Sequence, residues 1–271
     1  MTNKERIKII FRTVGKIIKK PSLILLVLSD ETEFKRHLKK TYGRTQFPTA
    51  DINQFLIDRK ATVNHYTFLD GSSLVTDLAL LKSIAQSVPE CKYLEIGTWR
   101  GESILNVVDA GAHCTSVNLS PEEIIASGFP KYAELQACLI KDTTNIKTVY
   151  ANSLTFDFST LNQKFDLIFV DGDHHYEAVK SDTRNVYQLL KNDNSMIVWH
   201  DYGYNPEKPR HSVIAGILDG LPAEAHKYLY HVSNTMCAVY TKKNLVADIQ
   251  HYPTRPDKTF CVMLENKSVE D

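Results

Sequence analysis

The stretch YLEIGTWRGES, residues 93–103, decides the fold of this chain. An apolar run ends at Ile96, a turn that contains Gly97 and Gly101 follows, and a helical pattern begins at Ser103. Glycines let the backbone turn tightly and approach a ligand closely, and the N–H groups at a helix start can face a carboxylate or another polar group. The stretch therefore predicts a strand, a turn and a helix at the start of an α/β domain.

The segments around this turn alternate between β-rich and helical patterns, which is typical of a parallel sheet covered by helices on both faces. We predict helices over residues 73–87, 103–110, 176–190 and 212–218, and strands over residues 92–96, 114–119, 147–151, 165–170, 196–200, 227–232 and 236–241. Only residues 233–235 separate the last two strands, so these strands should form an antiparallel hairpin. The expected fold is a doubly wound, Rossmann-like α/β sheet of seven strands ending in that hairpin.

The pattern divides the chain into a helical N-terminal extension over residues 1–70, the α/β domain over residues 71–245 and a C-terminal tail over residues 246–271. The first twenty residues carry seven basic residues and one acid, with apolar residues at helical spacing between them. Residues 4–20 therefore predict a basic amphipathic helix. This helix could contact an anionic membrane surface, cover the α/β domain or bind a second copy in a homodimer.

The overall composition is that of a soluble globular protein, with 43% hydrophobic and 24% charged residues. Basic and acidic residues number 32 each, so charge gives no argument for a nucleic-acid partner, and we expect none. The five cysteines are widely spaced without a CxxC pair, which predicts reduced core thiols. No secretory leader and no apolar run near ~20 residues is visible, so we expect a cytoplasmic protein, with the inner membrane surface as the alternative through residues 4–20.

The acid before the glycine turn, Glu95, disfavours a pyrophosphate and suits a cationic ligand. The GxGxxG and GxxxxGK[ST] patterns of phosphate-bearing cofactors are both missing. The amino and sulfonium groups of S-adenosylmethionine fit this site, although glycines at such a junction can also be purely structural. The predicted cofactor-binding residues are Glu95, Gly97, Thr98, Gly101, Glu102, Ser103, Asn118, Ser120, Asn152, Ser153 and Asp171.

Asn118 stands at the end of the second strand, where nucleotide-binding α/β folds place an acid on the ribose hydroxyls. An amide can still hydrogen-bond a diol without the charge-assisted part of the bond. The structural alternative is an Asx-turn before Pro121. Asn152 and Ser153, after the third strand, are expected at the adenine edge.

Polar clusters follow the fourth and fifth strands: DGDHHYE begins at Asp171 and HDY begins at His200. The carboxyl ends of such strands line the ligand crevice of an open α/β sheet. Methyl transfer to a hydroxyl needs a base or a metal that lowers the pKa of the acceptor, and acids and imidazoles can serve. Asp171, Asp173 and His174 are the candidate catalytic residues. His174 is favoured as the base because an unperturbed imidazole has a pKa of ~6.5.

Structural roles for the same side chains stay open. Asp173 could cap the helix that begins near His175. His175 itself suits the surface of a helix start, and His200 could be a core histidine with satisfied ring nitrogens.

The runs FDLIFVDGDHHYEAVKSD (residues 165–182) and MIVWHDYG (residues 196–203) resemble a class I methyltransferase family, methyltransferase 24, with a DGDHxYE motif after strand four and an HDY motif after strand five. They are similar, more remotely, to catechol-type and macrocin-type O-methyltransferases, in which acids at these strand ends hold Mg²⁺. The resemblance implies a metal site of Asp171, His200 and Asp201. His200 stands where those enzymes often have an acid, so Mn²⁺, Fe²⁺ or Zn²⁺ would suit the site as well as Mg²⁺.

The expected function is S-adenosylmethionine-dependent O-methylation of a small-molecule or sugar hydroxyl, and the resemblance suggests bacterial natural-product or glycan pathways. A metal-dependent hydroxylase of the cephalosporin-hydroxylase type is one rival, distinguished by bound iron and oxygen-dependent turnover. An RNA methyltransferase is disfavoured by the mildly acidic body of the chain. A non-catalytic protein would bind S-adenosylmethionine without consuming any acceptor. Residues 20–70 are expected to form a lid or dimer contact beside the acceptor pocket.

Overall fold

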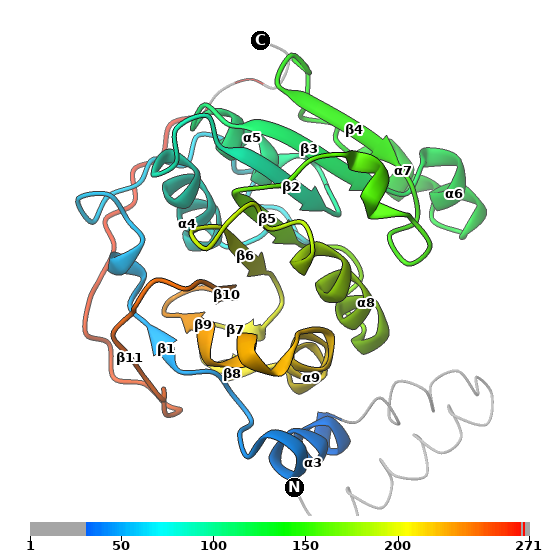
Figure 1. Cartoon of the computed structure of the whole chain (residues 1–271). Coiled ribbons are helices and arrows are strands. Elements are labelled where there is room, and N and C mark those ends of the chain that lie inside the picture. The colour runs from blue at the N-terminus through cyan, green and yellow to red at the C-terminus, as the bar shows by residue number, and fades with distance from the viewer. Residues whose placement is uncertain (1–30, 267, 269–271) are drawn as a thin grey trace, which may run out of the picture.

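The computed structural model describes residues 31–266 and residue 268 (Figure 1). The predicted amphipathic helix over residues 4–20 lies outside these residues. The helices are α3 (Glu31–Tyr42), α4 (Val75–Gln86), α5 (Glu102–Val108), α6 (Pro121–Ala126), α7 (Pro130–Leu135), α8 (Tyr176–Tyr187) and α9 (His211–Gly220), with 3-10 turns η1 (Ile52–Gln54), η2 (Phe158–Leu161) and η3 (Ala223–Tyr228). The strands are β1 (Thr49–Ala50), β2 (Lys92–Ile96), β3 (His113–Asn118), β4 (Ile146–Tyr150), β5 (Leu167–Val170), β6 (Met196–Trp199), β7 (Gly203–Asn205), β8 (Lys208–Pro209), β9 (Leu229–Val232), β10 (Ala238–Tyr240) and β11 (Ala247–Asp248).

The central sheet has the order β11-β1-β9-β10-β6-β5-β2-β3-β4. Strands β4, β3, β2, β5 and β6 pair in parallel, and β10 pairs antiparallel with both β6 and β9. The seven predicted strands are therefore all present, and the expected doubly wound sheet with a terminal hairpin is confirmed. The sixth predicted strand begins later than expected, at Leu229, because residues 223–228 form the turn η3.

The order of the strands reverses at β2, which pairs with β3 on one side and with β5 on the other. Ligands of open α/β sheets bind at the carboxyl ends of the strands beside such a reversal. The turn at Gly97 and the acid Asp171 follow β2 and β5 directly. The fold thus brings the two predicted halves of the site to one place.

Side chains of successive strand residues enter two separate cores, because neighbouring residues of a strand point to opposite faces. On β2, Tyr93 packs in the core that includes α4 and α5, whereas Leu94 packs in the core that includes α8 and α9. All four residues of β5 are buried, as a strand covered on both faces requires. The predicted three-layer arrangement follows from this alternation.

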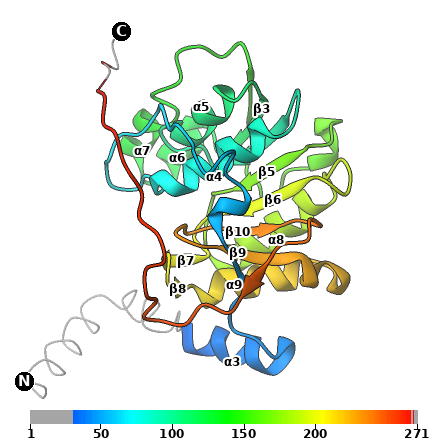
Figure 2. The same ribbon diagram turned by 90° about the vertical axis from the view of Figure 1, so that its left-hand side faces the viewer.

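The segments on both sides of the predicted α/β domain contribute to it. Strand β1 pairs in parallel with β9, and β11 pairs antiparallel with β1 (Figure 1). Helix α3 packs against α9 (Figures 1 and 2), where the Asp219 carboxylate accepts hydrogen bonds from Tyr42 and Tyr176. The division at residues 70 and 245 stays a prediction, but strands from both flanks extend the sheet by two.

Three of the five cysteines, Cys91, Cys114 and Cys237, are buried free thiols. Cys138 and Cys261 are exposed, so the prediction of core thiols is wrong for these two, which lie in the segment after α7 and in the C-terminal tail. Within residues 31–266, no helix has the length and apolar character needed to cross a membrane.

Gly97 gives a direct test of the contact between the turns after β2 and β5. A Cβ atom at Gly97 would lie 2.3 Å from the carbonyl oxygen of Asp171, and φ is +86°. Gly111 has nearly the same φ, +84°, but open space around it. We expect Gly111→Ala to lower the free energy of unfolding by about 1 to 2 kcal/mol, the cost of left-handed backbone. Gly97→Ala should cost about 1 to 3 kcal/mol more, because two backbones must separate. Urea unfolding of both variants measures this difference, and equal losses would contradict it.

Candidate active site

The glycine turn after β2 packs tightly against neighbouring chain. Gly101, at φ +105°, precedes α5, and a Cβ there would lie 2.7 Å from the Ile140 side chain. The segment after α7 runs along the turn, with Ala137 N–H donating to the Trp99 carbonyl at 2.6 Å and Leu139 N–H to the Arg100 carbonyl at 3.0 Å. Both glycines are therefore required by packing, which is the structural role left open by the sequence.

Glu95 is fully buried beneath this turn. Its carboxylate accepts hydrogen bonds from the hydroxyls of Tyr93 at 2.5 Å, Thr98 at 2.6 Å and Ser103 at 3.0 Å. Burial raises the pKa of Glu95 to about 7, although these hydrogen bonds oppose the shift. Glu95, Thr98 and Ser103 were predicted as cofactor residues, and the structure places them together in one hydrogen-bonded cluster. Their role toward a cofactor stays a prediction.

Asn118 joins the end of β3 to the glycine turn. Its Oδ1 accepts from the Thr98 N–H at 2.5 Å, and its amide nitrogen donates to Ser116. Both ends of the amide are thus used within the chain, and Asn118 is only 7% exposed. This is not the Asx-turn that we considered, because the partners lie in the glycine turn after β2 and on β3 rather than on the following residues.

The remaining predicted cofactor residues lie around the same edge with different partners. Glu102 is buried and accepts from the Thr67 N–H at 2.6 Å and from Ser72 Oγ at 2.9 Å, so the segment before α4 covers the start of α5. Ser120 caps α6 in a capping box with Glu123. Asn152, exposed, accepts from the Leu154 N–H at 3.0 Å.

Ser153 lies against a buried carboxylate of α8. Burial raises the pKa of that carboxyl group, Asp182, to about 6, and the nearby Ser153 hydroxyl opposes the rise. Neither oxygen of this carboxyl group has a hydrogen-bond partner among the described residues. Ser153 therefore lies where the segment after β4 approaches α8, at the end of the sheet where the adenine was expected.

Trp99, in the glycine turn, has a buried indole N–H with no hydrogen-bond partner among the described residues. A buried donor without a partner costs about 1 to 3 kcal/mol. The ring packs on Tyr132 at a centroid distance of 4.9 Å and under the Arg100 guanidinium at 5.2 Å. The indole nitrogen faces Gly71, where an added Cβ would lie 3.3 Å from it, so the segment before α4 covers this donor. Sequence reasoning missed Trp99, although its place between the two glycines was visible.

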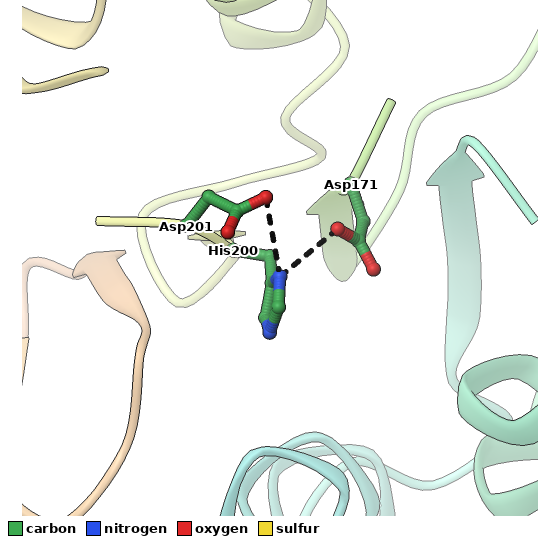
Figure 3. A group of neighbouring side chains, drawn as sticks. All are labelled: Asp171, His200 and Asp201. Atoms are coloured by element: carbon green, nitrogen blue, oxygen red, sulfur yellow. Dashed lines mark ion pairs between the residues drawn. The ribbon is translucent and has the colours of Figure 1, made fainter. Parts of the chain in front are cut away.

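Asp171, His200 and Asp201 meet at the ends of β5 and β6, as predicted. Ligand atoms from all three lie within 4.8 Å of one another. His200 Nδ1 is 3.1 Å from Asp171 Oδ1 and 3.6 Å from Asp201 Oδ2, so the imidazole stands between the two carboxylates (Figure 3). One imidazole and two carboxylates within this distance fit a divalent transition metal.

The charges at this centre depend on one another. Burial alone would lower the pKa of His200, but the neighbouring carboxylates, Asp171 first, raise it well above its ordinary value. Burial raises the pKa of Asp171. Burial would also raise the pKa of Asp201, but His200, His174 and Arg210 lower it. Asp171, His200 and Asp201 would hold a divalent cation, whose charge would offset that of the two carboxylates.

Asp77, on α4, is a member of this centre that sequence reasoning missed. It is fully buried, and its Oδ2 is 3.1 Å from His200 Nε2. The visible signal was an acid inside the apolar run of the predicted helix over residues 73–87. His200 therefore contacts carboxylates through both ring nitrogens and is not an ordinary core histidine.

The loop after β5 carries the candidate base. His174 Nδ1 is 3.6 Å from Asp201 Oδ2, and the side chain is 45% exposed. Burial, and then Arg210, lowers the pKa of His174. Asp173 accepts from the His175 N–H at 2.9 Å, but the residue that caps α8 is His175, so Asp173 does not cap the helix. His175 is 77% exposed, as expected for a surface position.

Arg210 is a further residue that the sequence did not indicate. Its Nη1 is 3.8 Å from Asp201 Oδ1, and its guanidinium lies over the Tyr204 ring at 5.2 Å. The small hairpin of β7 and β8, which was not predicted, brings these residues to the site. Asp201 has φ +55°, a left-handed conformation that is uncommon for residues other than glycine. Such strain is often kept at functional sites.

A family model of a methyltransferase domain, methyltransferase 24, matches residues 94–202. This segment contains the glycine turn and both motifs, and it confirms the resemblance that these motifs indicated. Residues 94–202 are therefore similar to a methyltransferase domain. No curated protein matches the chain.

Solved structures similar to this chain include three proteins from bacteria. Cofactor-bound Rv0187 from MTB is 18% identical, with 65% of this chain and 84% of that chain covered and a TM-score of 0.45. The O-methyltransferase from Bacillus cereus in complex with SAH is 15% identical, with 64% and 84% covered and a TM-score of 0.44. A putative caffeoyl-CoA O-methyltransferase from Staphylococcus aureus is 18% identical, with 61% and 82% covered and a TM-score of 0.43. These are distant likenesses, and the fold rests on the strand order described above.

The raised pKa of Glu95 predicts a pH dependence of stability. Because burial raises the pKa from 4.5 to about 7, the native protein binds more protons than the unfolded chain between these pH values. The free energy of unfolding should therefore fall as pH rises from 4.5 to 7, by up to about 3 kcal/mol from this group. Glu95→Gln stays neutral and should lack this part of the slope in urea unfolding across that range.

Tyr93→Phe is the matched control, because it removes one hydrogen bond that lowers the Glu95 pKa. This variant should raise the pKa of Glu95 further, so the free energy of unfolding should continue to fall at higher pH than in the wild type. If the free energy of unfolding changes with pH in the same way in the wild type and in Glu95→Gln, the pKa of Glu95 is not raised in the native protein.

Proposed function

We propose that this protein is an S-adenosylmethionine-dependent O-methyltransferase that acts on a hydroxyl of a small molecule or sugar with the help of a divalent metal. The observation that carries the proposal is the meeting of Asp171, His200 and Asp201 beside the glycine turn. The methyltransferase domain matched over residues 94–202 supplies the reaction class. Its carboxylate and imidazole groups can hold a metal ion that lowers the pKa of an acceptor hydroxyl.

The cofactor side of the proposal rests on the turn after β2. S-adenosylmethionine, when bound, supplies a methyl group already activated by its sulfonium, so no covalent nucleophile is required. Asp171 borders the turn, because its carbonyl oxygen lies 2.3 Å from the position of a Cβ at Gly97. Glu95 acts from beneath the turn, where it holds Thr98 and Ser103 in place.

The acceptor side rests on the acids and imidazoles after β5 and β6. A divalent metal at Asp171, His200 and Asp201 would lower the pKa of an acceptor hydroxyl. His174, whose pKa is lowered, is neutral near pH 7 and can accept the hydroxyl proton. Arg210 holds Asp201 from the other side and fixes its orientation. Catalysis is then mainly positioning together with removal of one proton.

The hydroxylase alternative receives less support from the donor set. Non-haem iron oxygenases commonly use two histidines and one carboxylate, whereas this centre has one histidine and two carboxylates. Iron binding accompanied by oxygen consumption would nevertheless favour that alternative over methyl transfer.

Calorimetry can separate cofactor binding from metal binding. Wild-type protein is titrated with S-adenosylhomocysteine and separately with Mn²⁺ or Mg²⁺, alongside the variants Asp171→Ala and Asp201→Asn. Asparagine tolerates the left-handed backbone at Asp201, so Asp201→Asn changes the charge and little else. We expect Asp201→Asn to bind S-adenosylhomocysteine like the wild type and to lose at least tenfold in Mn²⁺ affinity. Asp171→Ala should weaken the binding of both S-adenosylhomocysteine and Mn²⁺, because Asp171 borders the glycine turn and belongs to the proposed metal centre.

Two results would contradict the proposal. Absence of S-adenosylhomocysteine binding by the wild type would remove the cofactor, and with it the reaction. Unchanged Mn²⁺ affinity in both variants would remove the metal from this centre and leave His174 as the candidate base.

A further inference from the structure

The Asp77 carboxylate is held by three elements at once. Its Oδ2 accepts from the Leu74 N–H at 2.7 Å at the start of α4, and its Oδ1 accepts from the Met236 N–H at 2.9 Å in the turn between β9 and β10. The remaining partner of Oδ2 is His200 Nε2, at 3.1 Å. The side chain is completely buried, so its position and orientation are set by these contacts and not by solvent.

The partners of Asp77 bear on the tautomer of His200. An ionised carboxylate has no proton to give, so it can only accept hydrogen bonds. The two backbone N–H groups approach different oxygens, and each oxygen is therefore already an acceptor. With both oxygens facing N–H donors, this arrangement suits a carboxylate, and His200 Nε2, at 3.1 Å from Oδ2, is placed to donate a proton to it. The lone pair of a neutral His200 is consequently on Nδ1, which is the atom between Asp171 and Asp201.

We propose that Asp77 is the positioning residue of the metal centre: it holds His200 in the Nε2–H form, with Nδ1 directed at the cation. The proposal rests on the metal-assisted function proposed above. Carboxylates that accept the second N–H of a metal-binding histidine fix its tautomer and orientation, and their loss typically costs about 10- to 100-fold in metal affinity. Asp77 does not reach the cation or the acceptor itself, because His200 stands between them.

Asp77→Asn tests the proposal, since an amide cannot present two accepting oxygens. Its NH₂ group must face either the Met236 N–H or the Leu74 N–H and the imidazole, and in both placements His200 loses the negative charge that holds its Nε2–H. We expect Mn²⁺ affinity, measured by calorimetry, to fall about 10- to 100-fold while S-adenosylhomocysteine affinity stays within about twofold.

Thr76→Val is a matched control on the same helix. Thr76 Oγ1 donates to the Asn234 carbonyl at 2.6 Å, so it ties α4 to the same β9–β10 turn without contacting His200. This variant should lose stability but keep wild-type Mn²⁺ affinity. An equal loss of Mn²⁺ affinity in Thr76→Val would mean that Asp77 acts only by holding α4 against the β9–β10 turn. Unchanged Mn²⁺ affinity in Asp77→Asn would overturn the proposal.

Nitrogen NMR of the wild-type protein gives an answer even if Asp77→Asn does not fold. With Zn²⁺ bound, the His200 ring should show a protonated Nε2 and a metal-bound Nδ1. A metal-bound Nε2 would overturn the role of Asp77 while leaving the metal site intact. If wild-type protein binds neither Mn²⁺ nor Zn²⁺, the metal part of the proposed function fails, and this inference fails with it.

Discussion

The contact between the turns after β2 and β5 is the constraint on which the site depends. The backbone of Gly97 lies so close to that of Asp171 and Gly172 that no side chain has room there. The contact occurs where the strand order reverses, so the turn expected to face a cofactor and the acid expected to face a metal become direct neighbours. A larger residue at position 97 would separate the two halves of the site as well as destabilise the sheet.

The site also concentrates charge that the fold itself does not require. Asp77 and Glu95 are fully buried, and His200 is enclosed by three acids. Buried ions are costly unless they are paired and hydrogen-bonded, and a hydrophobic replacement often serves stability equally well. Here Glu95 is offset by three hydroxyls and Asp77 by two backbone N–H groups. Ionisable groups kept at such cost in one crevice are typical of functional sites.

Sequence patterns predicted the main strands and the polar motifs, which depend on residues close together in the chain. The seven main strands are β-rich runs of ordinary length. The two polar motifs follow strands directly, so their meeting point could be inferred from topology. Strands β1 and β11 have two residues each, which leaves no periodicity to recognise. Asp77 and Arg210 reach the site from α4 and from the start of α9, and only the packing of the whole domain brings them there. Asn118 was placed correctly at its strand end, but its partners Thr98 and Ser116 depend on how neighbouring strands align.

The pairing of β1 with β9 has a consequence for how the molecule assembles. Thr49 and His231 lie opposite each other in this pair, 182 residues apart in the chain. During synthesis β1 emerges long before any strand it can pair with, and β11, which covers its other side, emerges later still. Closing so long a loop is entropically costly and slows folding. The outer edge of the sheet should therefore form last, and a ribosome-bound chain stopped before β9 would leave β1 without a neighbour.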